Sequence, residues 1–310
     1  MGHADLPRGA RPRLKHRVEH LVFRKVMAGL GSRAPREALE RGARIGRLWR
    51  VLDRRHRALA EANIRAGLGL PAAEAARTAL ACFEHLGRTL AEFALAGSRA
   101  DEMISRFTLE GTEHLREALA RGKGAFVLSG HCGNWELLGA RLGREVPITG
   151  VARPMSNPLV DEEIAVLRRA AGQRAVEARN ATREIFRILG RNEVVGILLD
   201  QSALDRERVF VDFLGRPAST NFGLAMLALK TGAPVLPAFS ARGADGRHRA
   251  WIGAPIPFAE AGDREERIGV STARYTAAIE DYVRRYPEQW FWVHDRWKRV
   301  PEPGEPVWAP

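Results

Sequence analysis

Several features that would fix the class of this 310-residue chain are missing from it. Its two cysteines, Cys82 and Cys132, are too few for a disulfide framework, and no Cys-x-x-Cys spacing points to a zinc site. So few cysteines favour a reducing compartment. No run of about eighteen apolar residues is present, so we expect no transmembrane helix. The polar, Arg- and Pro-rich start argues against a secretory signal. We also expect no metal and no cofactor.

The positive charge is concentrated near the amino end. The formal net charge is +12, and residues 1–66 hold 17 of the 49 Lys and Arg but only 6 of the 37 Asp and Glu. The remainder, with 32 basic and 31 acidic residues, is close to neutral. A basic segment suits an anionic membrane surface, where each basic residue contributes about 1 kcal/mol. It would equally suit an acidic carrier protein or a nucleic acid, although the near-neutral remainder argues against nucleic acid.

Residues 14–30 combine this charge with a helical apolar pattern, formed by Val18, Leu21, Val22, Val26 and Leu30. The spacing predicts an amphipathic helix that lies either in a membrane interface or against the body of the protein. We expect helices to continue to residue 98.

From residue 106 onwards, short apolar runs alternate with helical patterns. The runs predict strands at 106–110, 124–129, 147–152, 194–199, 234–241 and 248–253. Helices are expected at 112–121, 134–145, 157–171, 180–190, 219–231 and 267–285. Ser219 and Thr220 would cap the helix that begins there. The alternation predicts an α/β layered fold, in which helices flank a mixed, largely parallel sheet.

The most informative stretch is Gly130-His131-Cys132-Gly133-Asn134-Trp135-Glu136, at the end of a predicted core strand. Catalytic groups of open α/β sheets lie at the carboxyl ends of strands. If His131 occupies the turn and Glu136 the first turn of the next helix, the two side chains can meet, and the carboxylate would make the imidazole a general base. The alternative is a structural histidine. A thiol nucleophile at Cys132 is disfavoured, and there is no Gly-x-Ser-x-Gly elbow to form an acyl-enzyme.

This stretch resembles the His-x-x-x-x-Asp/Glu signature of the lysophospholipid acyltransferase superfamily, and more closely its bacterial lipid A biosynthesis (late) acyltransferase branch. Three further segments are similar to that branch in the same order. They are Arg-Pro-x-x-Asn-Pro from Arg153, Leu-Asp-Gln at 199–201 with Phe-Leu-Gly-Arg-Pro-Ala from Phe213, and the aromatic ending at 289–298. The resemblance covers residues 14–300 and implies a glycerolipid acyltransferase-like fold.

The resemblance implies a direct transfer of a fatty acyl chain from acyl carrier protein or acyl-coenzyme A to a hydroxyl of a phosphorylated glycolipid, such as a lipid A precursor. His131 would be the base and Glu136 its orienting partner. Arg153 would hold an acceptor phosphate, unless it only forms a surface ion pair. Asp200 would pair with Arg153 or His131. The other candidate substrate-binding residues are Asn157, Gln201 and Asn134, the last with backbone N–H groups near Gly133 as oxyanion donors.

The implied partners are the acyl donor, a glycolipid acceptor and an anionic membrane surface. We expect residues 14–98 to dock on the cytoplasmic face of the inner membrane and residues 105–300 to form the catalytic domain, although the two can be one continuous domain. Alternatives stay open: an acceptor such as a phosphatidylinositol mannoside, a lipid esterase, or a non-catalytic basic module that binds anionic lipid or nucleic acid. Trp290, Phe291, Trp292 and Trp297 would lie in the core or at a membrane interface.

Overall fold

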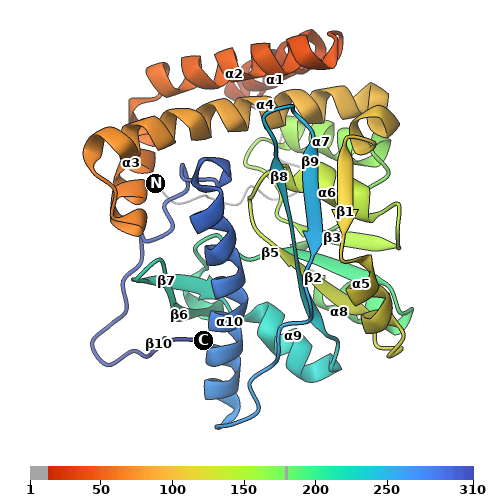
Figure 1. Ribbon diagram of the computed structural model, residues 1–310, viewed down its shortest axis with the longest axis vertical. Helices are drawn as coiled ribbons and strands as arrows, with labels where there is room; N and C mark the ends of the chain where they lie inside the picture. Colours follow the sequence, from red (N-terminus) through yellow and green to blue (C-terminus); the bar gives the residue numbers. More distant parts are fainter. Residues whose placement is uncertain (1–12, 179–180) are drawn as a thin grey trace.

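A computed structural model describes residues 13–178 and 181–310 of the chain. Four helices precede the first strand: α1 (Leu14–Gly31), α2 (Pro35–Leu52), α3 (Arg54–Leu68) and α4 (Ala72–Ile104). α2 and α4 lie along one another at the top of the molecule (Figure 1). Their close packing needs glycine on both helices. A Cβ atom at Gly46 would lie 1.9 Å from the Phe83 carbonyl oxygen, and a Cβ atom at Gly87 would lie 2.0 Å from the Gly42 carbonyl oxygen.

A seven-stranded sheet forms the centre, with the strand order β1-β9-β8-β2-β5-β3-β4. Strands β8, β2, β5, β3 and β4 are parallel to one another, and β9 is antiparallel to β8. The strands are β1 (Phe107–Glu110), β2 (Ala125–Ser129), β3 (Ile148–Ala152), β4 (Arg174–Glu177), β5 (Val194–Leu198), β8 (Val235–Arg242) and β9 (His248–Ile252). The predicted α/β fold with a mostly parallel, helix-flanked sheet is therefore confirmed.

Helices cover both faces of this sheet. They are α5 (Thr112–Leu119), α6 (Trp135–Leu142), α7 (Pro158–Ala170), α8 (Ala181–Gly190), α9 (Gly223–Thr231) and α10 (Arg264–Arg285). The central strand β2 is buried along its whole length, and its side chains alternate between the two core clusters: Phe126 packs in one and Val127 in the other. α4 contributes side chains to both clusters, because it runs across the carboxyl ends of the parallel strands (Figure 1).

The segment after β5 differs from the prediction. A short helix η2 (Asp205–Glu207) leads into a hairpin of β6 (Arg208–Phe213) and β7 (Arg216–Asn221), beside which β10 (Val307–Trp308) lies. The expected helix at 219–231 begins only at Gly223, and the expected cap is wrong: Ser219 and Thr220 are buried strand residues of β7. The turn between β6 and β7 places Leu214 and Gly215 at positive φ, a tight hairpin that a helical pattern search does not detect.

Candidate active site

His131 lies in the turn between β2 and α6, at the carboxyl end of the central strand. We call residues 130–134 the site turn. Its conformation depends on Gly133, which has φ +53° and whose added Cβ would lie 1.8 Å from the Ser240 carbonyl oxygen. The Gly133 N–H donates to the Gln289 carbonyl at 2.8 Å, and Cys132 forms a β-bridge with Trp290. The site turn is therefore held between β8 and the aromatic ending of the chain.

The imidazole of His131 is bound by Asp200, which follows β5. Nδ1 lies 2.8 Å from Asp200 Oδ1, and the His131 backbone N–H donates to Oδ2 at 2.9 Å. Oδ2 also accepts the indole N–H of Trp290 at 2.8 Å, and Asp200 is only 3 % exposed. Because an ionised carboxylate can only accept, this hydrogen bond puts the ring proton on Nδ1 and leaves the Nε2 lone pair available.

Burial and charge shift the pKa values of His131 and Asp200 in opposite directions. Burial lowers the pKa of His131, but the charge and hydrogen bond of Asp200 outweigh it, so the net pKa lies above its ordinary value. Burial raises the pKa of Asp200, but the His131 charge and the hydrogen bonds of its three donors bring it down to about 2. Asp200 therefore stays ionised at neutral pH and favours an imidazole that can accept a proton.

The open side of the imidazole is bordered by groups suited to a substrate. The His131 side chain is 21 % exposed, and Gln201 places its amide nitrogen 3.4 Å from Nε2. The rings of Trp135 and Phe291 lie 5.1 and 5.7 Å from the imidazole, measured between centroids. A hydroxyl group that reached Nε2 would thus meet a base, an amide and two aromatic walls.

Glu136 is placed differently from the expectation. Its two carboxylate oxygens accept hydrogen bonds of 2.9 and 2.6 Å from Arg168 of α7, a bidentate ion pair. No hydrogen bond joins Glu136 to His131 among the residues that the structure describes; the position that sequence reasoning gave to Glu136 is occupied by Asp200. Glu136 still raises the pKa of His131 through its charge, an effect that the charge of Arg168 opposes.

Asn134 and Asn157 both cap helices. Asn134 is fully buried; its side-chain oxygen accepts from the Leu137 N–H at the start of α6, and its amide donates to Glu92 at 2.7 Å. Asn157 caps α7 and donates to the His16 carbonyl at 3.0 Å, which ties α7 to α1. Both amides are thus committed within the fold. Of the backbone N–H groups around Gly133 that were expected to face an oxyanion, that of Gly133 itself donates to the Gln289 carbonyl.

The two remaining residues considered for the site, Arg153 and Cys132, differ in exposure. Arg153, beyond the end of β3, is exposed and makes no hydrogen bond or ion pair within the described part of the chain. It is therefore available to a ligand. Cys132 is fully buried, and burial together with the Asp200 charge raises the pKa of its thiol well above the ordinary value. A thiolate nucleophile is not favoured there.

Sequence reasoning missed three features of the site. Arg168 carries no local signal, because its role depends on α7 packing beside α6. Trp290 was assigned only to the core or a membrane interface; it is buried like Trp292 and Trp297, yet it also binds Asp200. Beneath the site turn, buried Glu92 of α4 binds Arg242 at 2.9 and 2.5 Å, and it also binds His248.

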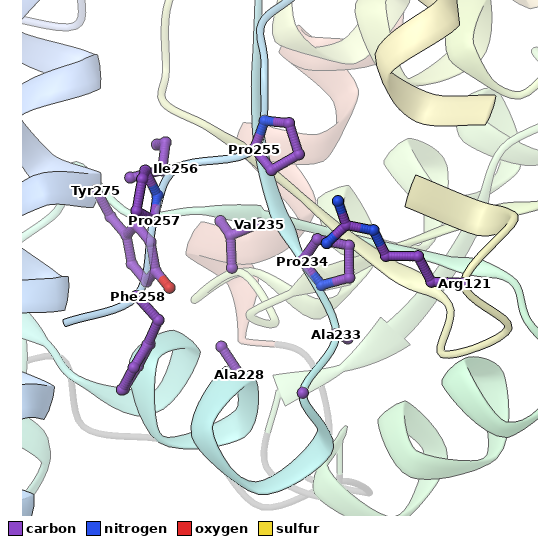
Figure 2. Close-up of a pocket in the computed structure, with 11 residues that line it drawn as sticks. Arg121, Ala228, Ala233, Pro234, Val235, Pro255, Ile256, Pro257, Phe258 and Tyr275 are labelled. Carbon is purple, nitrogen blue, oxygen red and sulfur yellow. The ribbon is translucent and has the colours of Figure 1, made fainter. Parts of the chain in front are cut away.

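Neither a metal site nor the cavity beside β8 adjoins His131 in the described residues. No group of three or more His, Cys, Asp or Glu side chains in residues 13–178 and 181–310 could hold a metal ion. A cavity of about 390 Å³ opens at the opposite end of the parallel strands, beside Pro234 and the first residue of β8, Val235 (Figure 2). It lies between Tyr275 and Phe258 on one side and Arg121 on the other. Since His131 follows the carboxyl end of a strand parallel to β8, this cavity is separate from the candidate active site.

The chain is similar to known proteins along most of its length. The family model of bacterial lipid A biosynthesis acyltransferases matches residues 12–299. The chain is 31 % identical over 222 residues to the lipid A biosynthesis lauroyltransferase of Escherichia coli (strain K12), covering 71 % of each chain. It is 29 % identical over 265 residues to the lipid A biosynthesis palmitoleoyltransferase of the same strain, covering 84 % of each. It is also 28 % identical over 191 residues to a phosphatidylinositol mannoside acyltransferase of Mycobacterium tuberculosis (strain ATCC 25618 / H37Rv), covering 60 % of this chain and 58 % of that one.

Proposed function

The chain belongs to the bacterial lipid A biosynthesis acyltransferase family, and from that premise we propose that it acylates a hydroxyl of a phosphorylated glycolipid, such as a lipid A precursor, with His131 as the base. The donor in this proposal is an acyl thioester, carried by acyl carrier protein or coenzyme A. The observation that carries the assignment of the base is the 2.8 Å hydrogen bond between His131 Nδ1 and buried Asp200. It directs the Nε2 lone pair to the other side of the ring, where an acceptor hydroxyl would replace the 3.4 Å contact with the Gln201 amide.

The proposed transfer is direct. Nε2 of His131 takes the proton of the acceptor hydroxyl while its oxygen attacks the thioester carbonyl carbon, and Asp200 stabilises the resulting imidazolium. The tetrahedral intermediate then collapses, the carbon–sulfur bond breaks, and the leaving thiolate receives the proton from Nε2. Proton and acyl group are thus balanced without an acyl-enzyme.

Three other groups receive roles in the proposal. Arg153 binds a phosphate of the acceptor, since its exposed guanidinium has a planar fork that matches phosphate oxygens. Gln201 donates to the acceptor or to the developing oxyanion, because its amide lies 3.4 Å from Nε2. Glu136 tunes the imidazole through its charge and holds Arg168 at the border of the site. Asn134 and Asn157 act as positioning residues, because both amides are bonded within the fold.

The proposed location is the cytoplasmic face of the inner membrane, where residues 14–98 would dock as a basic helical segment and residues 105–300 would hold the catalytic site. In the described ranges of the chain, no helix has both the length and the apolarity that a membrane span requires. A phosphatidylinositol mannoside is the second candidate acceptor, and it is favoured by the similarity to the mycobacterial acyltransferase.

The test compares lipid extracts, by mass spectrometry, from the source bacterium with the intact gene, without it, and with His131→Ala in its place. We expect a glycolipid lighter by one acyl chain in both altered strains, which would also identify the acceptor and the chain length. In parallel, purified wild-type and His131→Ala proteins are given an acyl thioester and the accumulated glycolipid. Wild-type transfer by the His131→Ala protein would contradict the mechanism.

A further inference from the structure

Helices α1 and α2 form a groove with an apolar floor and a basic rim. The groove is shallow and open to solvent, with a volume of about 440 Å³. Its floor is formed by Val26, Leu30 and Ile45, and Gly29 leaves room above it. Its rim carries Lys25 of α1 with Arg41 and Arg44 of α2. An amphiphilic ligand with an anionic head fits this combination.

Two of the three cations on the rim lack a carboxylate partner in the described part of the chain. Arg41 is paired with Glu37 at 3.0 Å. Lys25 and Arg44 are exposed, and neither pairs with a carboxylate among the residues that the structure describes. Two unpaired cations at the mouth of one groove complement a phosphate group.

The surface around the groove is apolar and exposed. Thirteen large hydrophobic side chains in the described residues are exposed, and seven of them lie on these two helices: Leu14, Val18, Leu21, Val22, Leu48, Val51 and Leu52. Leu21 lies one helical turn before Lys25, and Leu48 one turn after Arg44, so apolar side chains flank the rim. An acidic protein would complement the cations but would leave these aliphatic side chains in water, whereas the interface of an anionic bilayer complements both.

We infer that the groove between α1 and α2 binds the phosphate head and the first acyl carbons of an anionic phospholipid and thereby holds the enzyme on the bilayer. The groove is distinct from the catalytic site, because α4 lies between them: α2 packs on α4 at Gly42 and Gly87, and His85 of α4 bonds to the Gly133 carbonyl in the site turn (Figure 1). The inference rests on the proposed function only in that a lipid acceptor brings the enzyme to a membrane.

The experiment measures flotation of the full chain with vesicles of phosphatidylcholine alone or with phosphatidylglycerol added. The His131→Ala background is used, so that binding is measured without turnover. We expect Lys25→Gln with Arg44→Gln to weaken binding to the anionic vesicles about 30-fold, the size expected for two basic residues near such a surface. The charge-matched control is Lys15→Gln with Arg36→Gln, which removes one cation from each helix outside the groove and should change binding less than about threefold.

A second variant occupies the groove without changing its charge or adding apolar surface. A Cβ at Gly29 would meet nothing within 4 Å, so Gly29→Gln introduces no backbone clash and favours the helix. We expect it to weaken flotation about as much as the double charge variant. Equal losses in the groove and control pairs, or full binding by Gly29→Gln, would overturn the groove as a site.

Two further measurements separate the possible failures. If the groove variants lost binding to purified acyl carrier protein but kept vesicle binding, the partner would be the acidic protein and the inference would be wrong. Transfer assays in detergent micelles, with the groove variants made in the protein that retains His131, test the proposed function independently. If the protein with an intact groove bound vesicles but transferred no acyl chain, only the proposed function would be contradicted. If it transferred the acyl chain but the groove variants bound vesicles as well as it does, only the inference would be contradicted.

Discussion

Replacing Asp200 by asparagine tests the pairing that, in the proposed mechanism, makes His131 a base. Oδ2 accepts two N–H donors, from His131 and Trp290, whereas Oδ1 accepts only the imidazole Nδ1–H. In the Asp200→Asn variant, the single amide oxygen would therefore remain where two donors meet, and the NH₂ group would face Nδ1. An NH₂ group at that position favours the tautomer with the proton on Nε2, so the lone pair would be turned away from the acceptor hydroxyl.

Two effects follow. Loss of a hydrogen bond to a charged group lowers the free energy of unfolding by about 1.5–3 kcal/mol. Loss of the working tautomer removes general-base catalysis, which contributes roughly 10²–10⁴-fold. We therefore expect kcat/KM of Asp200→Asn to fall by about 10²–10⁴-fold. The acid limb of the pH profile should also move to lower pH, because burial lowers the pKa of His131 and only the partner carboxylates raise it.

The assay is acyl transfer to the glycolipid that accumulates in the strain without the gene, measured from about pH 5 to 9, with thermal unfolding as a check that the variant is folded. A purely structural role for Asp200 would lower activity in proportion to the folded fraction and leave the acid limb in place. A folded Asp200→Asn protein with kcat/KM within about threefold of wild type and an unmoved acid limb would refute the reasoning.

Three other predictions concern the site turn. Gly133→Ala should lower the melting temperature and abolish transfer, because its Cβ would lie 1.8 Å from the Ser240 carbonyl oxygen; a wild-type melting curve would contradict this. Cys132→Ala should retain transfer within about tenfold, since burial raises the pKa of its thiol and no nucleophile is lost; complete loss of transfer by folded protein would reinstate the thiol. The third concerns acid stability: burial, then the Arg242 charge, holds the pKa of His85 well below its ordinary value, so the unfolded chain takes up a proton that the folded protein does not. Stability to urea should fall below about pH 6.5 by ~1.4 kcal/mol per pH unit for this group, and a flat stability between pH 6.5 and 5 would contradict it.

Six of the seven strands of the central sheet could be predicted because their signals are local, whereas β4 (Arg174–Glu177) was not predicted. The predicted runs at 106–110, 124–129, 147–152, 194–199, 234–241 and 248–253 correspond to β1, β2, β3, β5, β8 and β9. Each is a short apolar segment bounded by residues that favour turns. The hairpin at 208–221 was not predicted because β7 combines Pro, Ser, Thr and Asn with complete burial of its centre. Buried Arg296, from the aromatic ending of the chain, donates to the Ser219 carbonyl and to the Thr220 hydroxyl there.

The site was predictable to the extent that one turn contains it. His131, its place at the end of a core strand and the glycine that the turn requires are all visible within residues 124–136. The choice between Asp200 and Glu136 as its partner was not visible there. Asp200 follows β5, and only the parallel pairing of β2 with β5 brings residues 69 positions apart into hydrogen-bond contact.

By itself, the sequence determined the α/β class, the family and the position of the proposed base, because hydrophobic periodicity and motif spacing are properties of neighbouring residues. Tertiary structure alone decided which carboxylate holds the imidazole, that Arg168 binds Glu136, and that Asn134 and Asn157 serve the fold rather than face the open site. It also decided that a basic-rimmed groove lies between α1 and α2. These outcomes depend on distances between elements far apart in the chain, which are set when the strands pair and the helices pack.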